Sequence, residues 1–269
     1  MSADDYLRKV LERYDNNYQY NRNEVDAFRD LEYKIRNWFN GSVYSGFGPK
    51  VEIQQSGSRA KGTAIKGSSD MDMFLSITDR SNEDTLKNYY DEIYDYLKKQ
   101  GYTVRKQNVS IGIKFKGYDI DVVPAKKTNK SSYRRDDLDY YDHWLWSNKK
   151  QARTLANIQR HIDMVQNSGL KNEIMLTKIW RNNHNLDFPS IYIEVLIIES
   201  LKGKLSGSLS NNFLTILKYI RDNILNQKVV DPSNCQNIIS ESLNNTEKMK
   251  IKNAAASSLN KEYWSDIVW

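Results

Sequence analysis

Apolar residues recur at helical spacing near the N-terminus and through the second half of the chain. Spacings of three and four residues predict amphipathic helices wherever they persist over several turns. The predicted helices cover residues 3–20, 23–40, 83–99, 137–165, 170–184, 190–202, 208–226 and 244–260. The second half of the chain is therefore predicted to be almost wholly helical.

Shorter stretches in the first half alternate between apolar and polar residues, which predicts strands. These stretches lie near residues 51–54, 71–77, 102–108, 110–115 and 118–123. The order of the elements predicts a small mixed sheet covered by helices and followed by a helical bundle, so the fold class is α+β. We expect an α/β core with the N-terminal helices over 1–135 and a helical domain over 136–269.

Composition narrows the classes of protein that remain. The chain has 269 residues, one cysteine and a formal net charge of +6. A single cysteine excludes a disulfide scaffold. There is no apolar run of the ~18 residues that a membrane span needs, and no apolar signal segment, so we expect a cytoplasmic protein without a membrane partner. The basic excess favours a phosphate-bearing partner or a solvated basic surface.

Two pairs of aspartates stand two residues apart on predicted strands. Asp70 and Asp72 open one strand, and Asp119 and Asp121 lie on another. Because side chains alternate along a strand, both carboxylates of a pair share one face and repel each other unless a cation neutralises them. Mg²⁺ prefers such oxygen ligands. If the two strands are neighbours, three carboxylates could hold two metal ions; metal-free surface aspartates are the alternative.

A Gly-Ser turn precedes the first aspartate pair. Gly57 and Ser58 follow a predicted strand and precede a short helix in RAKGTAI. A glycine lets the backbone approach a phosphate, whose oxygens the helix-start N–H groups and the serine hydroxyl can bind. An ordinary capped turn is the alternative. The sequence contains neither GxxxxGK[ST] nor GxGxxG, so a P-loop and a dinucleotide fingerprint are excluded.

In these motifs the sequence resembles the DNA polymerase β superfamily of nucleotidyltransferases. It is most similar to the cGAS/DncV-like nucleotidyltransferases (CD-NTases) and the oligoadenylate synthases, through GSRAKGTAIKGSSDMDMFLSI and DIDVVPA. The resemblance implies a polymerase-β-like fold with an N-terminal spine helix, whose nucleotide cleft a C-terminal helical bundle completes. It assigns Asp70, Asp72 and Asp121 to catalysis and to two Mg²⁺ ions, or Mn²⁺ in their place. It assigns Gly57 and Ser58 to nucleotide binding.

The helical half extends the resemblance. LKNEIMLTKIWRNNHN resembles the family helix whose lysine reaches the nucleotide triphosphate, which would be Lys178. FPSIYIEVLIIESL resembles the next family helix, whose leading serine contacts phosphate and would be Ser190. Tyr192 follows closely, and its ring is predicted either to stack on a base or to pack in the core.

The resemblance implies a synthase that joins nucleoside triphosphates into a cyclic di- or trinucleotide and releases pyrophosphate. The substrates would be ATP, GTP or a pyrimidine nucleotide. In bacteria such enzymes signal phage infection to a downstream effector in CBASS anti-phage systems. Two alternatives stay open: a terminal nucleotidyltransferase acting on RNA ends, and an inactive binding module, against which the three intact aspartates argue.

Basic residues crowd the segment after the second aspartate pair. By analogy with animal relatives that double-stranded nucleic acid activates, this surface would bind a structured RNA; a solvated surface is the alternative. The residues are Lys126, Lys127, Lys130, Arg134 and Arg135.

Overall fold

The computed structural model describes residues 1–15, 22–41, 50–67, 70–78, 85–128, 133–135, 138–140 and 142–269. The contacts between residues divide the chain into two units. The sheet unit comprises residues 19–61 and 69–162. The helical unit comprises 1–18, 62–68 and 163–269. Each unit therefore draws on segments that are far apart in the sequence.

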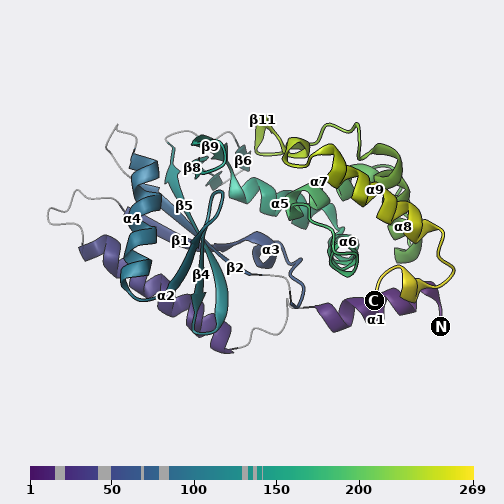
Figure 1. Ribbon diagram of the computed structural model, residues 1–269, viewed down its shortest axis with the longest axis horizontal. Helices are drawn as coiled ribbons and strands as arrows, with labels where there is room; N and C mark the ends of the chain where they lie inside the picture. The colour runs from purple at the N-terminus through teal and green to yellow at the C-terminus, as the bar shows by residue number, and fades with distance from the viewer. Residues whose placement is uncertain are drawn as a thin grey trace. The chain divides into compact units, whose positions relative to one another are not determined.

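A mixed sheet forms the centre of the sheet unit, with its main strands in the order β1-β2-β5-β4-β3 (Figure 1). β2 and β5 run parallel, whereas β1 with β2, β5 with β4 and β4 with β3 are antiparallel. The first two predicted strands, 51–54 and 71–77, are confirmed, as are the three short runs after Gly101. Their bounds are β1 (Lys50–Ser56), β2 (Met71–Thr78), β3 (Thr103–Lys106), β4 (Ile111–Phe115) and β5 (Tyr118–Lys127).

Helices α2 (Arg22–Gly41) and α4 (Thr85–Lys99) lie against one face of this sheet (Figure 1). Their apolar stripes pack on alternate residues of the strands, such as Met73 in β2 and Val122 in β5. Because side chains alternate along a strand, the residues between these point to the opposite face. That opposite face carries Asp72 and Asp121.

The helical unit is built on long helices that share one hydrophobic core. The core contains apolar residues from α1, α6, α7, α8 and α9, among them Leu7, Trp180 and Phe213. The helices are α1 (Ala3–Tyr14), α6 (Lys171–Asn183), α7 (Ser190–Leu201), α8 (Leu209–Asn223) and α9 (Asn245–Leu259). Between α8 and α9 lie the paired strands β10 (Val230–Asp231) and β11 (Asn234–Ile238), and short 3₁₀ helices lie at Ile239–Ser242 and Trp264–Asp266. Across the described ranges, none of the helices combines the length and the apolar character that crossing a bilayer requires.

The predicted helix over 137–165 is wrong for most of its length. The chain there forms strands before α5 (Ile158–Ser168), and β8 pairs with the end of β5 through Lys127 and His143. Burial alternates from His143 to Ser147, the period of a strand, and the aromatic side chains favour that geometry. The strands are β6 (Tyr133–Arg135), β7 (Leu138–Tyr140), β8 (His143–Ser147) and β9 (Ala152–Ala156).

The division into units also differs from the predicted domain bounds 1–135 and 136–269. β8 and β9 extend the sheet, so the sheet unit continues to residue 162. Helix α1, which the sequence grouped with the core, buries Leu7, Val10 and Leu11 in the helical unit. The short helix α3 (Gly57–Ala60) lies at the end of the first segment of the sheet unit, residues 19–61.

Candidate active site

One row of paired residues crosses the sheet from β1 to β3. Ser56 pairs with Asp72, Asp72 with Asp121, Asp121 with Gly112, and Gly112 with Arg105. Residues paired across neighbouring strands point to the same face. The carboxylates of Asp72 and Asp121 therefore stand side by side, and the condition for a shared site, that their strands are neighbours, is met.

The Gly-Ser turn lies directly against Asp72. Gly57 begins α3 with a φ of +64°, a left-handed conformation that favours glycine. A Cβ atom added to Gly57 would lie 1.7 Å from Oδ2 of Asp72, far inside van der Waals contact. Arg59, two residues on, forms an ion pair of 3.0 Å with Glu24 of α2, which anchors the turn. The turn can therefore lie this close to the carboxylate of Asp72 only because residue 57 is glycine.

Burial and mutual repulsion raise the pKa of two of the aspartates. The pKa of Asp121 is raised first by burial and then by the nearby charge of Asp70. The pKa of Asp70 is raised by burial and by Asp119. Arg105 opposes both shifts, and its guanidinium lies 4.0 Å from the carboxylate of Asp70. The acids therefore lie close enough to repel each other, which a cation would relieve.

The side chains of the aspartates are not arranged as a metal centre in this structure. Among the residues that the structure describes, no three acidic, histidine or cysteine side chains are arranged to hold a metal ion. Asp72 and Asp121 are in register, whereas Asp70 precedes β2 and is paired with Arg105. A cation bound by Asp70 would therefore compete with Arg105 for the carboxylate of Asp70.

Two polar side chains hold the carboxylate of Asp121. Nε2 of Gln107 donates to Oδ1 at 3.1 Å, and the hydroxyl of Ser110 donates to Oδ2 at 3.4 Å. Both residues lie in the turn between β3 and β4. Neither residue was singled out from the sequence, where Gln107 falls in the predicted strand 102–108 and Ser110 opens the predicted strand 110–115.

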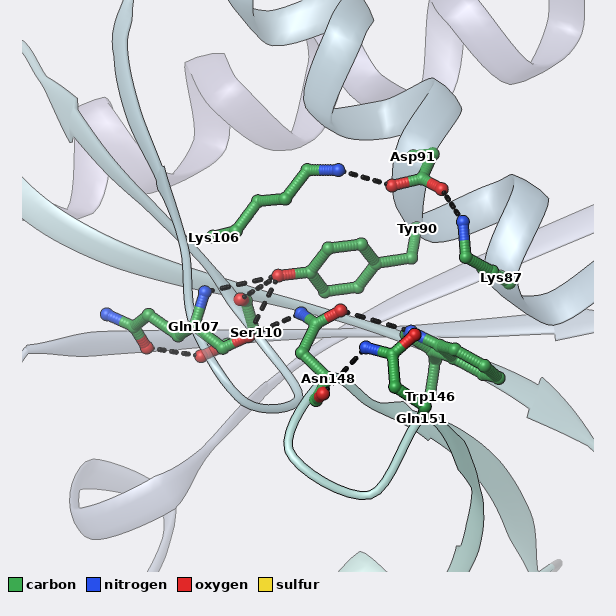
Figure 2. A network of polar contacts seen from close by, with 9 residues as sticks. All are labelled: Lys87, Tyr90, Asp91, Lys106, Gln107, Ser110, Trp146, Asn148 and Gln151. Carbon is green, nitrogen blue, oxygen red and sulfur yellow. Dashed lines mark hydrogen bonds and ion pairs between the residues drawn. The ribbon is translucent and has the colours of Figure 1, made fainter.

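The turn is itself fixed by a network that Figure 2 shows. The hydroxyl of Tyr90 in α4 donates to the carbonyl oxygens of Gln107 and Ser110, at 3.1 and 2.8 Å. Nδ2 of Asn148, beyond β8, donates to the Gln107 carbonyl oxygen at 2.6 Å. Elements on two sides therefore fix the turn that positions Asp121.

Lys178 is buried in the helical unit rather than exposed to solvent. Its Nζ donates to the hydroxyl of Thr63 at 2.9 Å and forms an ion pair with Oε1 of Glu194 at 3.2 Å. Both charged side chains are almost fully buried, at 2% and 1% exposure. A phosphate would have to replace one of these oxygens, and the triphosphate role of Lys178 stays a prediction.

Ser190 and Tyr192 lie at the start of α7 in different surroundings. The hydroxyl of Ser190 is half-buried and accepts a hydrogen bond of 3.4 Å from Nη1 of Arg181. Arg181 lies three residues after Lys178, a helical spacing that the sequence analysis did not use. Tyr192 is fully buried beside Phe188, and burial raises its pKa to about 12. The core alternative for Tyr192 is therefore favoured over base stacking.

We predict that replacing Lys178 with methionine will lower the free energy of unfolding by about 3–5 kcal/mol, because it removes the buried cation that pairs with the carboxylate of Glu194. The double variant Lys178→Met/Glu194→Leu should recover most of this loss. Urea unfolding followed by circular dichroism measures both. Wild-type stability in Lys178→Met would contradict the structural role of the pair.

The predicted RNA-binding residues are only partly described. Lys126 and Lys127 lie in β5, and Lys127 forms an ion pair of 3.6 Å with Glu52. Arg134 and Arg135 lie in β6, and Lys130 lies outside the described residues. The RNA-binding surface therefore stays a prediction.

Comparison with known proteins gives one family and several related folds. The model of the Second Messenger Oligonucleotide or Dinucleotide Synthetase domain, SMODS, matches residues 1–160. The cyclic AMP-AMP-AMP synthase of Escherichia coli (strain MS 115-1) is 24% identical over 197 residues, which cover 68% of this chain and 59% of that relative. This chain thus spans less than two thirds of the curated relative.

Solved structures share the fold over nearly the whole chain. E. coli MS115-1 CdnC with ATP has a TM-score of 0.72 and 19% identity, covering 96% of this chain and 90% of that one. The Elizabethkingia meningoseptica CdnE cyclic dinucleotide synthase, solved with GTP and Apcpp, has a TM-score of 0.67 and 14% identity, covering 94% and 98%. These likenesses confirm the predicted α+β, polymerase-β-like fold class.

Proposed function

This chain belongs to the Second Messenger Oligonucleotide or Dinucleotide Synthetase family, and we propose that it joins nucleoside triphosphates into a cyclic di- or trinucleotide. Membership of this family confirms the predicted resemblance to CD-NTases. It also supports the predicted class of enzyme, a nucleotidyltransferase. The observation that carries the proposal is the pairing of Asp72 with Asp121 beside Gly57. This places two carboxylates next to a turn suited to phosphate.

The donor set fits hard divalent cations. Asp72 and Asp121 are in register, and Asp70 is near enough to raise the pKa of Asp121. Asp70, Asp72 and Asp121 would hold two Mg²⁺ ions, or Mn²⁺ in their place, because carboxylate oxygens are their preferred protein ligands. Bound metal ions would neutralise the carboxylates and the charge that develops on the phosphates.

The chain's own groups would position the two nucleotides and move one proton. The N–H of Gly57 and the hydroxyl of Ser58 bind the donor triphosphate. Asp121 accepts the proton of the attacking ribose hydroxyl as its oxygen bonds to the donor α-phosphorus. The bond from that phosphorus to the bridging oxygen breaks, and pyrophosphate leaves. Positioning and charge neutralisation supply most of the rate.

Incubation with the four nucleoside triphosphates and Mg²⁺, followed by mass spectrometry, tests this function. We expect cyclic products and pyrophosphate, both lost when EDTA is present. A parallel reaction contains a labelled RNA oligonucleotide. Products that appear only as extensions of the RNA would replace this proposal with the alternative, a terminal nucleotidyltransferase.

We further propose that the cyclic product signals to a downstream effector in anti-phage defence and that structured RNA activates synthesis. The basic residues at the end of β5, Lys126 and Lys127, support the second point. Binding to a phosphate backbone weakens steeply as salt rises, because counterions are released. Activation by a structured RNA should therefore fall between 50 and 200 mM salt. Activation that ignores salt would contradict it.

A further inference from the structure

Arg105 lies at the end of the row that carries the aspartates, and we propose that its guanidinium binds the 5′-phosphates of the acceptor nucleotide. The inference rests on the proposed function and adds a residue and a substrate group to it. Arg105 is in β3, two strands from Asp121 and on the same face of the sheet. It was not among the residues that the sequence singled out.

Gly112 lies between Arg105 and Asp121 in the row, and its lack of a side chain leaves space for the side chain of Arg105. A Cβ atom at Gly112 would lie 2.5 Å from Nε of Arg105 and 2.9 Å from Nε2 of Gln107. The two side chains thus occupy the space above the β4 backbone that any other residue would fill. Gly112 is not in the left-handed region, so its backbone conformation does not require glycine. Glycine is required at this position because the side chains of Arg105 and Gln107 approach the backbone so closely.

The ion pair of Arg105 with Asp70 is suited to exchange. The two groups are 4.0 Å apart, and their side chains are 62% and 46% exposed. Ion pairs between side chains this exposed are weak, so a stronger ligand of either group replaces them readily. Once a cation holds Asp70, the guanidinium has its donors available. Its planar fork matches the oxygens of a phosphate and binds two of them at once.

The order of the row assigns Arg105 to the acceptor rather than the donor. Gly57 and Ser58 follow Ser56 at the β1 end of the row, beside Asp72. Arg105 lies at the β3 end, beyond Asp121. If the donor triphosphate binds the Gly-Ser turn at the β1 end, the attacking nucleotide has to bind at the other end of the row, beside Asp121. In the first condensation the attacking nucleotide still carries its own 5′-triphosphate. The negative charge of this second triphosphate needs a positively charged group to neutralise it, and Arg105 is placed to supply one.

The test separates the two nucleotides by chemistry. A 2′,3′-dideoxynucleoside triphosphate serves as the donor, because it lacks a hydroxyl with which to attack. The acceptor is either a nucleoside triphosphate or the matching nucleoside. The kcat/KM of the first condensation is measured for both acceptors in the wild type, Arg105→Ala and Arg105→Lys. Arg153→Ala is the control, since Arg153 is an exposed arginine of β9 outside the row.

We expect Arg105→Ala to lower kcat/KM about 10- to 100-fold with the triphosphate acceptor, the worth of a charge-assisted contact. With the nucleoside acceptor the value should stay near that of the wild type. Arg105→Lys should recover part of the loss, and Arg153→Ala should lose nothing. An equal loss with both acceptors, or no loss with either, would overturn the inference. A wild type that makes no product from any nucleotide would instead overturn the proposed function and the inference with it.

Discussion

Replacing Asp72 with asparagine will lower nucleotidyl transfer about 1,000-fold and leave the sheet unit folded. Asp72 lies in the middle of the row, paired with Ser56 on one side and Asp121 on the other. Asparagine keeps the shape that fits against Gly57 but removes the charge that would hold a cation. The loss should therefore appear in product formation, measured by mass spectrometry, and not in the thermal unfolding curve.

The matched control for this variant is Asp91→Asn. Asp91 is also a carboxylate of the sheet unit, but it lies in α4 and pairs with Lys87 and Lys106, as Figure 2 shows. It should keep wild-type activity. A titration of each variant with Mn²⁺, followed by electron paramagnetic resonance, reads metal binding without turnover. If Asp72→Asn binds Mn²⁺ and turns over like the wild type, Asp72 has no role in the metal site.

The acidic row could be predicted from the sequence because its signals are local. The two-residue spacing of each aspartate pair fixes a shared face, and apolar neighbours mark both segments as buried strands. The helix predicted over 137–165 failed because a stretch that contains Trp144, Leu145 and Trp146 is apolar enough to satisfy either period in a short window. The stretch forms a strand because β8 pairs with β5. This pairing joins residues far apart in the sequence, so a short window of sequence does not reveal it.

The supports of the site could not be predicted for the same reason. Thr63 and Lys178 are separated by 115 residues, yet Lys178 donates to Thr63 in the interior of the helical unit. The family resemblance gave Lys178 a phosphate role and said nothing of this buried partner. Gln107 and Asn148, which fix the turn beside Asp121, are 41 residues apart. Such contacts become visible only when the fold brings the segments together.

Gly57→Ala is expected to lower both activity and stability, because two separate requirements for glycine meet at this position. A left-handed φ costs a residue with a Cβ atom about 1–2 kcal/mol. The added carbon would also lie 1.7 Å from Oδ2 and 2.9 Å from Cβ of Asp72, so turning the carboxylate alone cannot relieve the clash. The backbone of the turn or of β2 must move. We expect activity to fall about 100-fold, since small displacements of a catalytic group have effects of this size.

Gly117→Ala separates the two requirements. Gly117 lies in the turn between β4 and β5 of the same unit and has a φ of +87°, but a Cβ atom there would meet nothing within 4 Å. It should therefore lose about 1–2 kcal/mol of stability to the backbone alone and keep its activity. Urea unfolding and the nucleotide assay, applied to both variants, give the difference that belongs to the contact with Asp72. Equal activities would mean that the close approach of the turn to Asp72 is not needed for transfer. A loss confined to Gly57→Ala would tie the Gly-Ser turn and the first carboxylate of the row into one catalytic element.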